Sequence, residues 1–138
     1  MKYLLDTNIV SEPTRLQPDL AVMQRIELNT IFSCTSATAW MELWHGIHLL
    51  DSGKRKQELT TYLNMLTEDG FTILPFCQHA AEWLAGERVR LKALGITPGK
   101  YDSEIAAVAV VNELTLVTRN TNDFVVFDGM KLENWFDL

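Results

Sequence analysis

Short apolar runs alternate with longer amphipathic segments along the whole chain, and this alternation constrains the fold more than any other feature. The short runs predict strands, and the longer segments, whose apolar residues recur at helical spacing, predict helices. No hairpin signal separates neighbouring runs, so consecutive strands should be linked through helices. The pattern therefore predicts one α/β domain over residues 1–138, with a central, mostly parallel β-sheet flanked by α-helices.

The expected elements follow from this pattern and from the residues that interrupt it. Strands are predicted over residues 2–5, 31–34, 71–76 and 114–118, with a short final strand over 131–135. Helices are predicted over 18–28, 78–94 and 102–112. Two more are predicted, one between Ser36 and Asp51 and one between Gly53 and Gly70. Thr35 or Ser36 can cap the first of these two. Helix 102–112 is apolar on nearly all sides and should be buried. In helix 78–94 the apolar face consists of Ala81, Leu84, Ala85, Val89 and Leu91.

Composition narrows the classes of protein that this chain can be. With 47% hydrophobic residues it can bury a substantial core, which excludes intrinsic disorder. The longest apolar run of its second half, residues 105–111, is far shorter than the ~20 residues that a bilayer requires. No secretory hydrophobic segment precedes Asp6, and Cys34 and Cys77 make no disulfide framework. We therefore expect a cytoplasmic protein without a membrane segment.

The formal net charge is −6. This charge argues against a passive nucleic-acid binder, because phosphate contacts usually need a basic surface. It does not argue against a metal-dependent nuclease. Carboxylates gathered to hold divalent cations are anionic by themselves and attract phosphates once the metal is bound.

Acidic side chains stand where the predicted strands end. Asp6 ends the first predicted strand in a turn, and Asp102 opens the predicted helix 102–112. Asn120 and Asp123 lie just past the strand 114–118. Ligands of an open parallel sheet bind beyond the carboxyl ends of its strands, so these residues are candidates for a functional site.

Glu42 has an informative position in the helix after the second predicted strand. It falls outside the apolar arc of that helix and is bordered by Ala39 and Gly46, so a ligand or another segment can approach it. Each acid alone has an ordinary structural explanation, as a solvated residue, a turn residue or an N-cap. Asp102, for example, could be an N-cap. Several acids crowded into one cleft, however, repel one another and are stable mainly when cations neutralise them. Oxygen ligands favour Mg²⁺ or Mn²⁺, which support phosphodiester cleavage.

Other chemistries find no support in the sequence. His45, His48 and His79 have no zinc-ligand spacing with either cysteine. No glycine-rich phosphate loop and no serine nucleophile elbow is present. The four tryptophans are explained better by core packing than by base stacking, although Trp40 or Trp44 could face a partner chain.

Four short segments stand in order along the chain: LLDTNIVSE (4–12), AWMELWHG (39–46), YDSEIAAVA (101–109) and LVTRNTNDF (116–124). They resemble the motifs of PIN-domain nucleases, and more narrowly those of the VapC toxins of bacterial toxin–antitoxin pairs. The resemblance implies a PIN-like fold and an Mg²⁺- or Mn²⁺-dependent endoribonuclease that cleaves RNA, often tRNA, and so arrests translation. It also implies a homodimer that is silenced by a cognate antitoxin, which blocks the active cleft. Operator DNA is then bound only through the antitoxin.

The resemblance also assigns roles to residues of this chain. Asp6, Glu42 and Asp102 become the core acids that hold the metal. In the fourth motif many members carry Asp where this chain has Asn120, and others combine Asn there with an Asp three residues later. Either Asn120, through its carbonyl oxygen, or Asp123, through its charge, is therefore expected to contact the metal. We take Asp123 as the fourth catalytic candidate and Asn120 as the fourth metal-ligand candidate.

Substrate contacts are assigned to residues beside these acids. Thr7 and Asn8 are expected to orient Asp6 or to bind phosphate, and Thr118 to support the site from behind. Six basic residues are candidates for phosphate contacts: Arg15, Lys54, Arg55, Lys56, Lys100 and Arg119. Lys100 and Arg119 are favoured because they neighbour motif residues, and the others are expected to be solvated surface charges.

Two further interpretations stay open. A non-catalytic α/β module that binds a divalent ion and regulates a partner would use the same acids without cleaving RNA. A DNA-directed nuclease or a phosphatase with a similar pocket is the third. Cleavage assays on RNA, DNA and a simple phosphate ester distinguish these from a ribonuclease.

Overall fold

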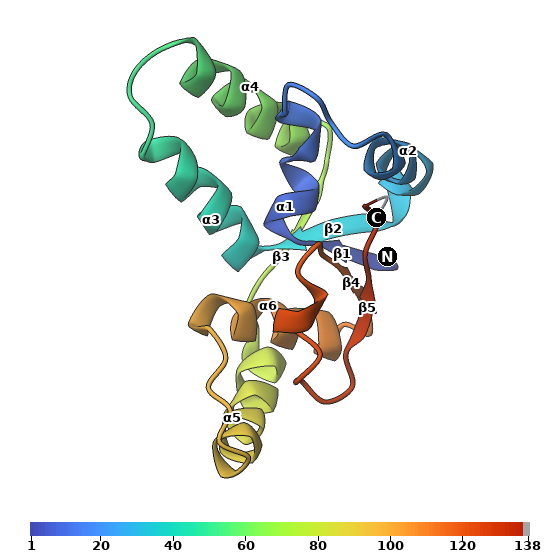
Figure 1. Ribbon diagram of the computed structural model, residues 1–138, viewed down its shortest axis with the longest axis vertical. Coiled ribbons are helices and arrows are strands. Elements are labelled where there is room, and N and C mark those ends of the chain that lie inside the picture. The colour runs from blue at the N-terminus through green and yellow to red at the C-terminus, as the bar shows by residue number, and fades with distance from the viewer. Residues whose placement is uncertain (137–138) are drawn as a thin grey trace.

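The computed structural model describes residues 1–136 and contains a five-stranded sheet in the order β3-β2-β1-β4-β5 (Figure 1). Its four strand pairings are all parallel, which confirms the predicted α/β fold. The strands are short: β1 (Tyr3–Leu5), β2 (Ser33–Ser36), β3 (Thr72–Leu74), β4 (Thr115–Val117) and β5 (Lys131–Glu133).

The strand order creates a topological switch point between β1 and β4. From β1 the chain adds β2 and then β3 on one side of the sheet, and β4 and β5 lie on the other side. A crevice opens at the carboxyl ends of the strands where the order reverses in this way. The end of β1, at Asp6, therefore lies in the middle of the sheet, beside the end of β4.

Helices cover both faces of the sheet: α1, α2 and α4 lie on one side in Figure 1, and α5 and α6 on the other. Within the described residues, no helix combines the length and the apolar character needed to cross a membrane. The helices are α1 (Thr7–Val10), α2 (Leu20–Asn29), α3 (Ala37–His48), α4 (Lys54–Glu68), α5 (Gln78–Ala93) and α6 (Lys100–Val111), with 3₁₀ turns η1 (Glu12–Thr14), η2 (Thr30–Phe32) and η3 (Thr121–Asp123).

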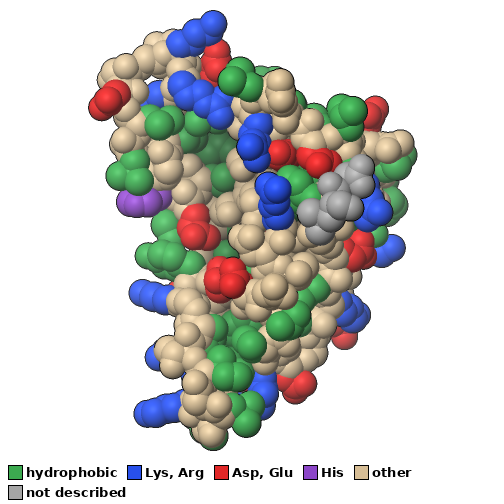
Figure 2. All heavy atoms as spheres, viewed as in Figure 1, with side chains coloured by type: hydrophobic (Ala, Val, Ile, Leu, Met, Phe, Trp, Pro, Cys, Tyr) green, Lys and Arg blue, Asp and Glu red, His purple; other side chains and the backbone are tan. Residues whose placement is uncertain are grey.

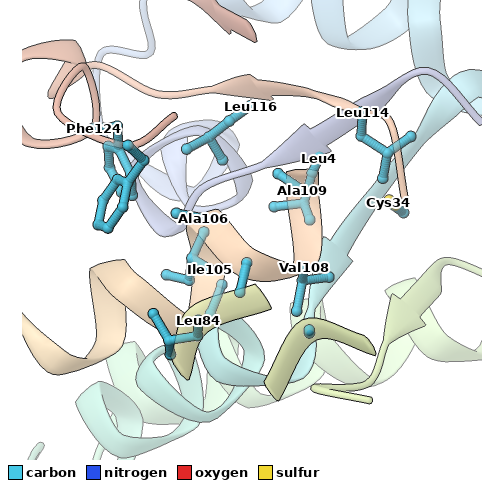
Figure 3. Packing of buried hydrophobic residues seen from close by; sticks show 14 of the residues in the cluster. Leu4, Cys34, Leu84, Ile105, Ala106, Val108, Ala109, Leu114, Leu116 and Phe124 are labelled. Carbon is cyan, nitrogen blue, oxygen red and sulfur yellow. The ribbon is translucent and has the colours of Figure 1, made fainter. Parts of the chain in front are cut away.

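Side chains that alternate along the strands divide the core into two parts. Leu4 of β1 and Leu116 of β4 pack toward α6, where Ile105, Ala106 and Ala109 are fully buried (Figure 3). This confirms that the helix with apolar residues on nearly all sides lies in the core. The second part, on the face that carries α1 and α2, consists of Tyr3, Leu5, Ile9, Val10, Val22, Val117, Trp135 and Phe136.

The second strand lies two residues later than predicted. Ile31 and Phe32, expected in a strand over 31–34, belong to η2 and are exposed. The strand itself, residues 33–36, is polar but buried, because its side chains find backbone partners. The Thr35 hydroxyl donates to the Leu5 carbonyl at 2.7 Å. Hydrogen bonding rather than hydropathy fixes this strand, so an apolar pattern misplaces it.

Helix α5 buries a different face from the predicted one. Ala81, Ala85 and Val89 are exposed, so their assignment to the buried face is wrong. The buried positions are Ala80, Leu84, Glu87 and Leu91, which also recur at helical spacing but include a charged residue. Hydropathy cannot select a face that contains a buried glutamate.

Glu87 ties α5 to the segment between η3 and β5. One oxygen of its carboxylate accepts a hydrogen bond from Arg90 Nε, and the other accepts one from the Asp128 N–H at 2.7 Å. Arg90 also donates to the Val126 carbonyl at 2.8 Å. A buried carboxylate is tolerated only with such partners, so Glu87 fixes the position of the 126–128 segment on α5.

We expect Glu87→Gln to lower the free energy of unfolding by about 1–3 kcal/mol, because a neutral amide weakens hydrogen bonds that involve a charged acceptor. Urea denaturation followed by circular dichroism measures the change. Glu82→Gln is the matched control, since Glu82 lies on the same helix with 62% of its side chain exposed, and should change the value by less than about 0.5 kcal/mol. Equal effects of the two substitutions would contradict the structural role of Glu87.

Candidate active site

Asp6 ends β1 and caps the short helix α1, which stands where a turn was predicted. Only 5% of Asp6 is exposed. Its Oδ1 accepts a hydrogen bond from the Thr7 N–H at 2.8 Å, and its Oδ2 accepts one from the Thr118 hydroxyl at 2.8 Å. Thr118 follows β4 directly, so this contact joins the carboxyl ends of the two central strands. Thr7 and Thr118 thus orient the Asp6 carboxylate from two sides.

Thr118 is the centre of a polar network at this edge of the sheet. Its hydroxyl oxygen accepts a hydrogen bond from the Asn120 N–H at 3.1 Å, and the amide nitrogen of Asn8 lies 3.5 Å away. The Oδ1 atom of Asn8 accepts a hydrogen bond from the Arg119 N–H at 3.1 Å. Asn8 therefore positions the turn over residues 118–120, and phosphate binding by Asn8 or Thr7 stays a prediction.

Helix α3 carries Glu42, which is half-buried. Ser36 at the end of β2 caps the helix, as predicted: its hydroxyl accepts a hydrogen bond from the Ala39 N–H at 3.1 Å. Ala39 is fully buried, whereas a Cβ atom added to Gly46 would meet nothing within 4 Å. Glu42 therefore lies between the packed start of α3 and an open part of the helix, where a ligand has room.

Asp102 lies in the first turn of α6, which begins earlier than the predicted helix 102–112. Gly99 is the N-cap residue, so the interpretation of Asp102 as an N-cap is wrong. The cause is local: both the backbone N–H and the hydroxyl of Ser103 donate to the Gly99 carbonyl, at 3.0 and 2.7 Å, and close the first turn there. The Asp102 carboxylate lies beside Gly99, because a Cβ atom there would be 3.5 Å from Oδ2.

Asn120 precedes η3 and Asp123 is its last residue, just after β4, and both are exposed. The Asp123 N–H donates to the Asn120 carbonyl at 3.0 Å, which closes this turn. The charge of Asp123 raises the pKa of both Asp6 and Asp102. Asp123 is therefore electrostatically part of the site, and the choice between Asn120 and Asp123 as a metal ligand stays a prediction.

The acids share one electrostatic environment although they come from four separate segments. Burial raises the pKa of Asp6, and hydrogen bonds from Thr118 and Thr7 act in the opposite direction. Burial also raises the pKa of Asp102, to which Asp6 adds. Burial raises the pKa of Glu42 as well, and Asp6 and Asp102 add to this shift. The fold thus brings like charges together at the carboxyl edge of the sheet.

The side chains of these residues are suitable ligands for a hard cation, because all their donor atoms are oxygens. Within residues 1–136, however, no three Asp, Glu, His or Cys side chains lie close enough to hold one ion by themselves. Mg²⁺ usually keeps several waters and binds only one or two protein carboxylates. The donor set therefore fits Mg²⁺ or Mn²⁺ with water completing the coordination.

Glu104 is a further acid of this cluster that was not predicted from the sequence to belong to the site. Its carboxylate accepts a hydrogen bond from the Thr38 hydroxyl at 2.8 Å, and its charge raises the pKa of Glu42. The signal available in the sequence was the acid two residues after Asp102 in the third motif.

The two basic residues favoured as phosphate contacts lie at different points around the acids. The Arg119 guanidinium stands over the Phe136 ring, with Cζ 4.4 Å from the ring centroid, and follows Thr118 directly. Lys100 is exposed at the start of α6, two residues before Asp102. Both positions leave the charged group accessible, and their contact with substrate stays a prediction.

The chain is similar to known proteins over nearly its whole length. The family model described as PIN domain matches residues 3–129. Toxin FitB of Neisseria gonorrhoeae is 35% identical over 139 residues, which cover 97% of this chain and 99% of that protein. The tRNA(fMet)-specific endonuclease VapC of Salmonella typhimurium is 29% identical over 139 residues, 98% of each protein. A solved structure of FitAB bound to an IR36 DNA fragment has a TM-score of 0.88 and 32% identity, covering 99% of this chain and 96% of that one.

We expect Asp102→Asn to stabilise the metal-free protein at neutral pH. The pKa of Asp102 is raised above 3.8 in the folded state, so the ionised carboxylate costs stability once the pH rises through that raised value. In EDTA at pH 7.5 the variant should gain roughly 2–4 °C in Tm for each kcal/mol of repulsion relieved, and the gain should shrink toward pH 4. Asp51→Asn, in an exposed loop, should leave Tm unchanged. A lower Tm for Asp102→Asn than for the parent chain at pH 7.5 would show that the charge of Asp102 does not destabilise the folded protein.

Proposed function

Because this chain belongs to the PIN-domain family, we propose that it is a VapC-type toxin, an Mg²⁺- or Mn²⁺-dependent endoribonuclease that hydrolyses phosphodiester bonds of RNA and so arrests translation. The observation that carries the proposal is the gathering of Asp6, Glu42, Asp102 and Asp123 at the carboxyl edge of the sheet. Such mutual repulsion lowers the stability of the folded chain, so the cluster is better explained by a ligand than by folding.

The metal would be held by Asp6, Glu42 and Asp102, each directly or through a water molecule, because no three of these side chains are close enough to hold it alone. The Asn120 carbonyl oxygen is proposed as a further ligand and Asp123 as the fourth acid. When bound, Mg²⁺ or Mn²⁺ supplies a water of lowered pKa and offsets the phosphate charge. The chain itself supplies positioning: the hydrogen bonds from Thr7 and Thr118 fix both oxygens of Asp6 before the substrate arrives.

The proposed substrate class is tRNA, since a relative is named a tRNA(fMet)-specific endonuclease. Thr7, Asn8, Lys100 and Arg119 are proposed to contact the RNA backbone next to the acids. A chain of net charge −6 needs such local cations and the bound metal to attract phosphates. Binding should therefore weaken as the salt concentration rises.

The proposed partners are a cognate antitoxin, a second copy of this chain and, through the antitoxin alone, operator DNA. FitAB, to which this chain is similar, was solved bound to DNA. The negative charge of this chain supports indirect rather than direct DNA contact. Leu20, Leu28 and Ile31, on and around α2, are large apolar side chains that are exposed. Such exposed apolar surface supports the proposal that this face is covered by another chain. We place this activity in the cytoplasm, where tRNA is used.

Asp6→Asn should abolish RNA cleavage and cell toxicity while leaving the fold intact, because the amide keeps the shape of the side chain but loses its charge. Purified protein is incubated with total tRNA and Mg²⁺ or Mn²⁺, with an EDTA control, and the products are resolved on a denaturing gel. Asp51→Asn should cleave like the parent chain. Cleavage by Asp6→Asn at the parental rate would refute the site assignment. No cleavage by the parent chain with either metal would favour a non-catalytic ion-binding module.

Metal binding should also be visible without catalysis. Mn²⁺ at about 100 times its Kd should stabilise the parent chain by about 2.7 kcal/mol, because the ion binds only the folded state. Asp102→Asn should show a smaller rise in Tm on addition of Mn²⁺, although its Tm in EDTA is higher. An equal rise in both proteins would place the ion elsewhere.

A further inference from the structure

A hollow of about 390 Å³ opens beside the acids, between α3, α4 and the segment around η1. Its floor is apolar, made by Leu43, Ile47, Leu50, Leu59 and Leu63. Its size lies in the range of pockets for single small ligands, ~300–1,000 Å³. Glu42 belongs to its wall, so the hollow adjoins the acid cluster at this residue.

The rim of this hollow carries two guanidinium groups. Arg15 follows η1 and lies 3.5 Å from one oxygen of the buried Glu12, while 59% of its side chain is exposed. Arg55 donates from Nη1 to the Thr14 carbonyl at 2.7 Å and is also exposed. Each contact occupies only part of a group with five N–H donors. Both arginines are therefore anchored at the rim with donors left for a ligand.

The placement of Arg55 is not explained by helix stability. Lys54, Arg55 and Lys56 fill the first turn of α4, which contains no acid. Cations at a helix N-terminus oppose the helix dipole and so lower the stability of the helix. Figure 2 shows several Lys and Arg side chains in the upper half of this face, with acidic side chains among and below them. This arrangement suits an anion that reaches from the rim toward the acids.

We propose that this hollow binds one unpaired nucleotide of the RNA, next to the bond that is cleaved. The base would lie on the apolar floor, and its phosphate would bind Arg15 and Arg55. Gly46 lines the hollow, and a Cβ atom added there would meet nothing within 4 Å, so a bulky side chain at this position is expected to occupy part of the open space. The inference rests on the proposed function and gives Arg15 and Arg55, rather than only Lys100 and Arg119, a role in binding RNA.

Binding is tested with Asp6→Asn protein, which keeps RNA intact, and a fluorescein-labelled single-stranded oligoribonucleotide of mixed sequence. Fluorescence anisotropy gives Kd from 50 to 200 mM NaCl. Adding Arg55→Ala should weaken binding about tenfold and reduce the dependence of log Kd on log salt by about 0.7, the value for one phosphate contact on a single strand. Adding Gly46→Trp should weaken binding at least tenfold without changing that dependence.

Two matched substitutions control for charge and for helix effects. Arg25→Ala removes the same charge from α2, away from the lining of the hollow, and Gly46→Ala adds only a methyl group to α3. Both should keep Kd within twofold of the parent. If Arg25→Ala and Arg55→Ala weaken RNA binding equally, the effect is explained by net charge alone and the proposal is overturned. Arg15 is left unchanged, because its removal would strand the buried Glu12.

The outcomes separate this inference from the proposed function. If the parent chain cleaves RNA while Arg55→Ala and Gly46→Trp bind it normally, the nucleotide site is wrong and the ribonuclease stands. If RNA binding depends on both residues but no cleavage occurs, the site stands and the ribonuclease is wrong. If both variants bind RNA normally but lose a co-expressed antitoxin, the hollow is a protein-binding site and the inference fails.

Discussion

The hydrogen bond from the Thr118 hydroxyl to the Asp6 carboxylate is the contact on which the rest of the site depends. It joins the ends of β1 and β4, where the strand order reverses, between residues 112 positions apart in the sequence. Because both oxygens of Asp6 have hydrogen-bond donors, a nearly buried carboxylate is kept in a single orientation. Asn120 and Asn8 gather around the same hydroxyl, so the turn after β4 is built on this contact.

The molecule separates the region that stabilises it from the region that carries charge. Below the sheet edge, α6 contributes fully buried small and branched side chains, and burial of such surface is the main favourable term in folding. At the edge, the charge of Asp6 adds to the raised pKa of Glu42 and of Asp102, and the charge of Asp102 adds to that of Glu42. The basic first turn of α4 opposes its own helix dipole. Both arrangements lower stability locally. The core therefore holds in place a site that would not persist by its own interactions.

The sequence was informative where burial follows hydropathy. The parallel sheet, the buried helix α6 and the Ser36 cap were predictable from apolar periodicity and capping preference. The proximity of Asp6, Glu42 and Asp102 was expected because Asp6 ends a strand, Glu42 lies in the helix after the second strand and Asp102 opens a helix. Their roles toward metal stay predictions. Burial by hydrogen bonding was not predictable, as in the polar strand β2 and at Glu87 on α5. The hollow beside Glu42 was not predictable either, because it depends on how α3 and α4 pack against η1.

The distance along the chain between the parts of the site has a consequence during synthesis. Asp6 leaves the ribosome early, but Asp102, Thr118 and Asp123 follow only near the end of the chain, and β4 must then pair between β1 and β5. Such long-range contacts form only after the intervening segments are available. A nascent chain therefore cannot carry the complete acid cluster. A ribonuclease built in this way would gain its complete acid cluster only when its own synthesis is almost finished.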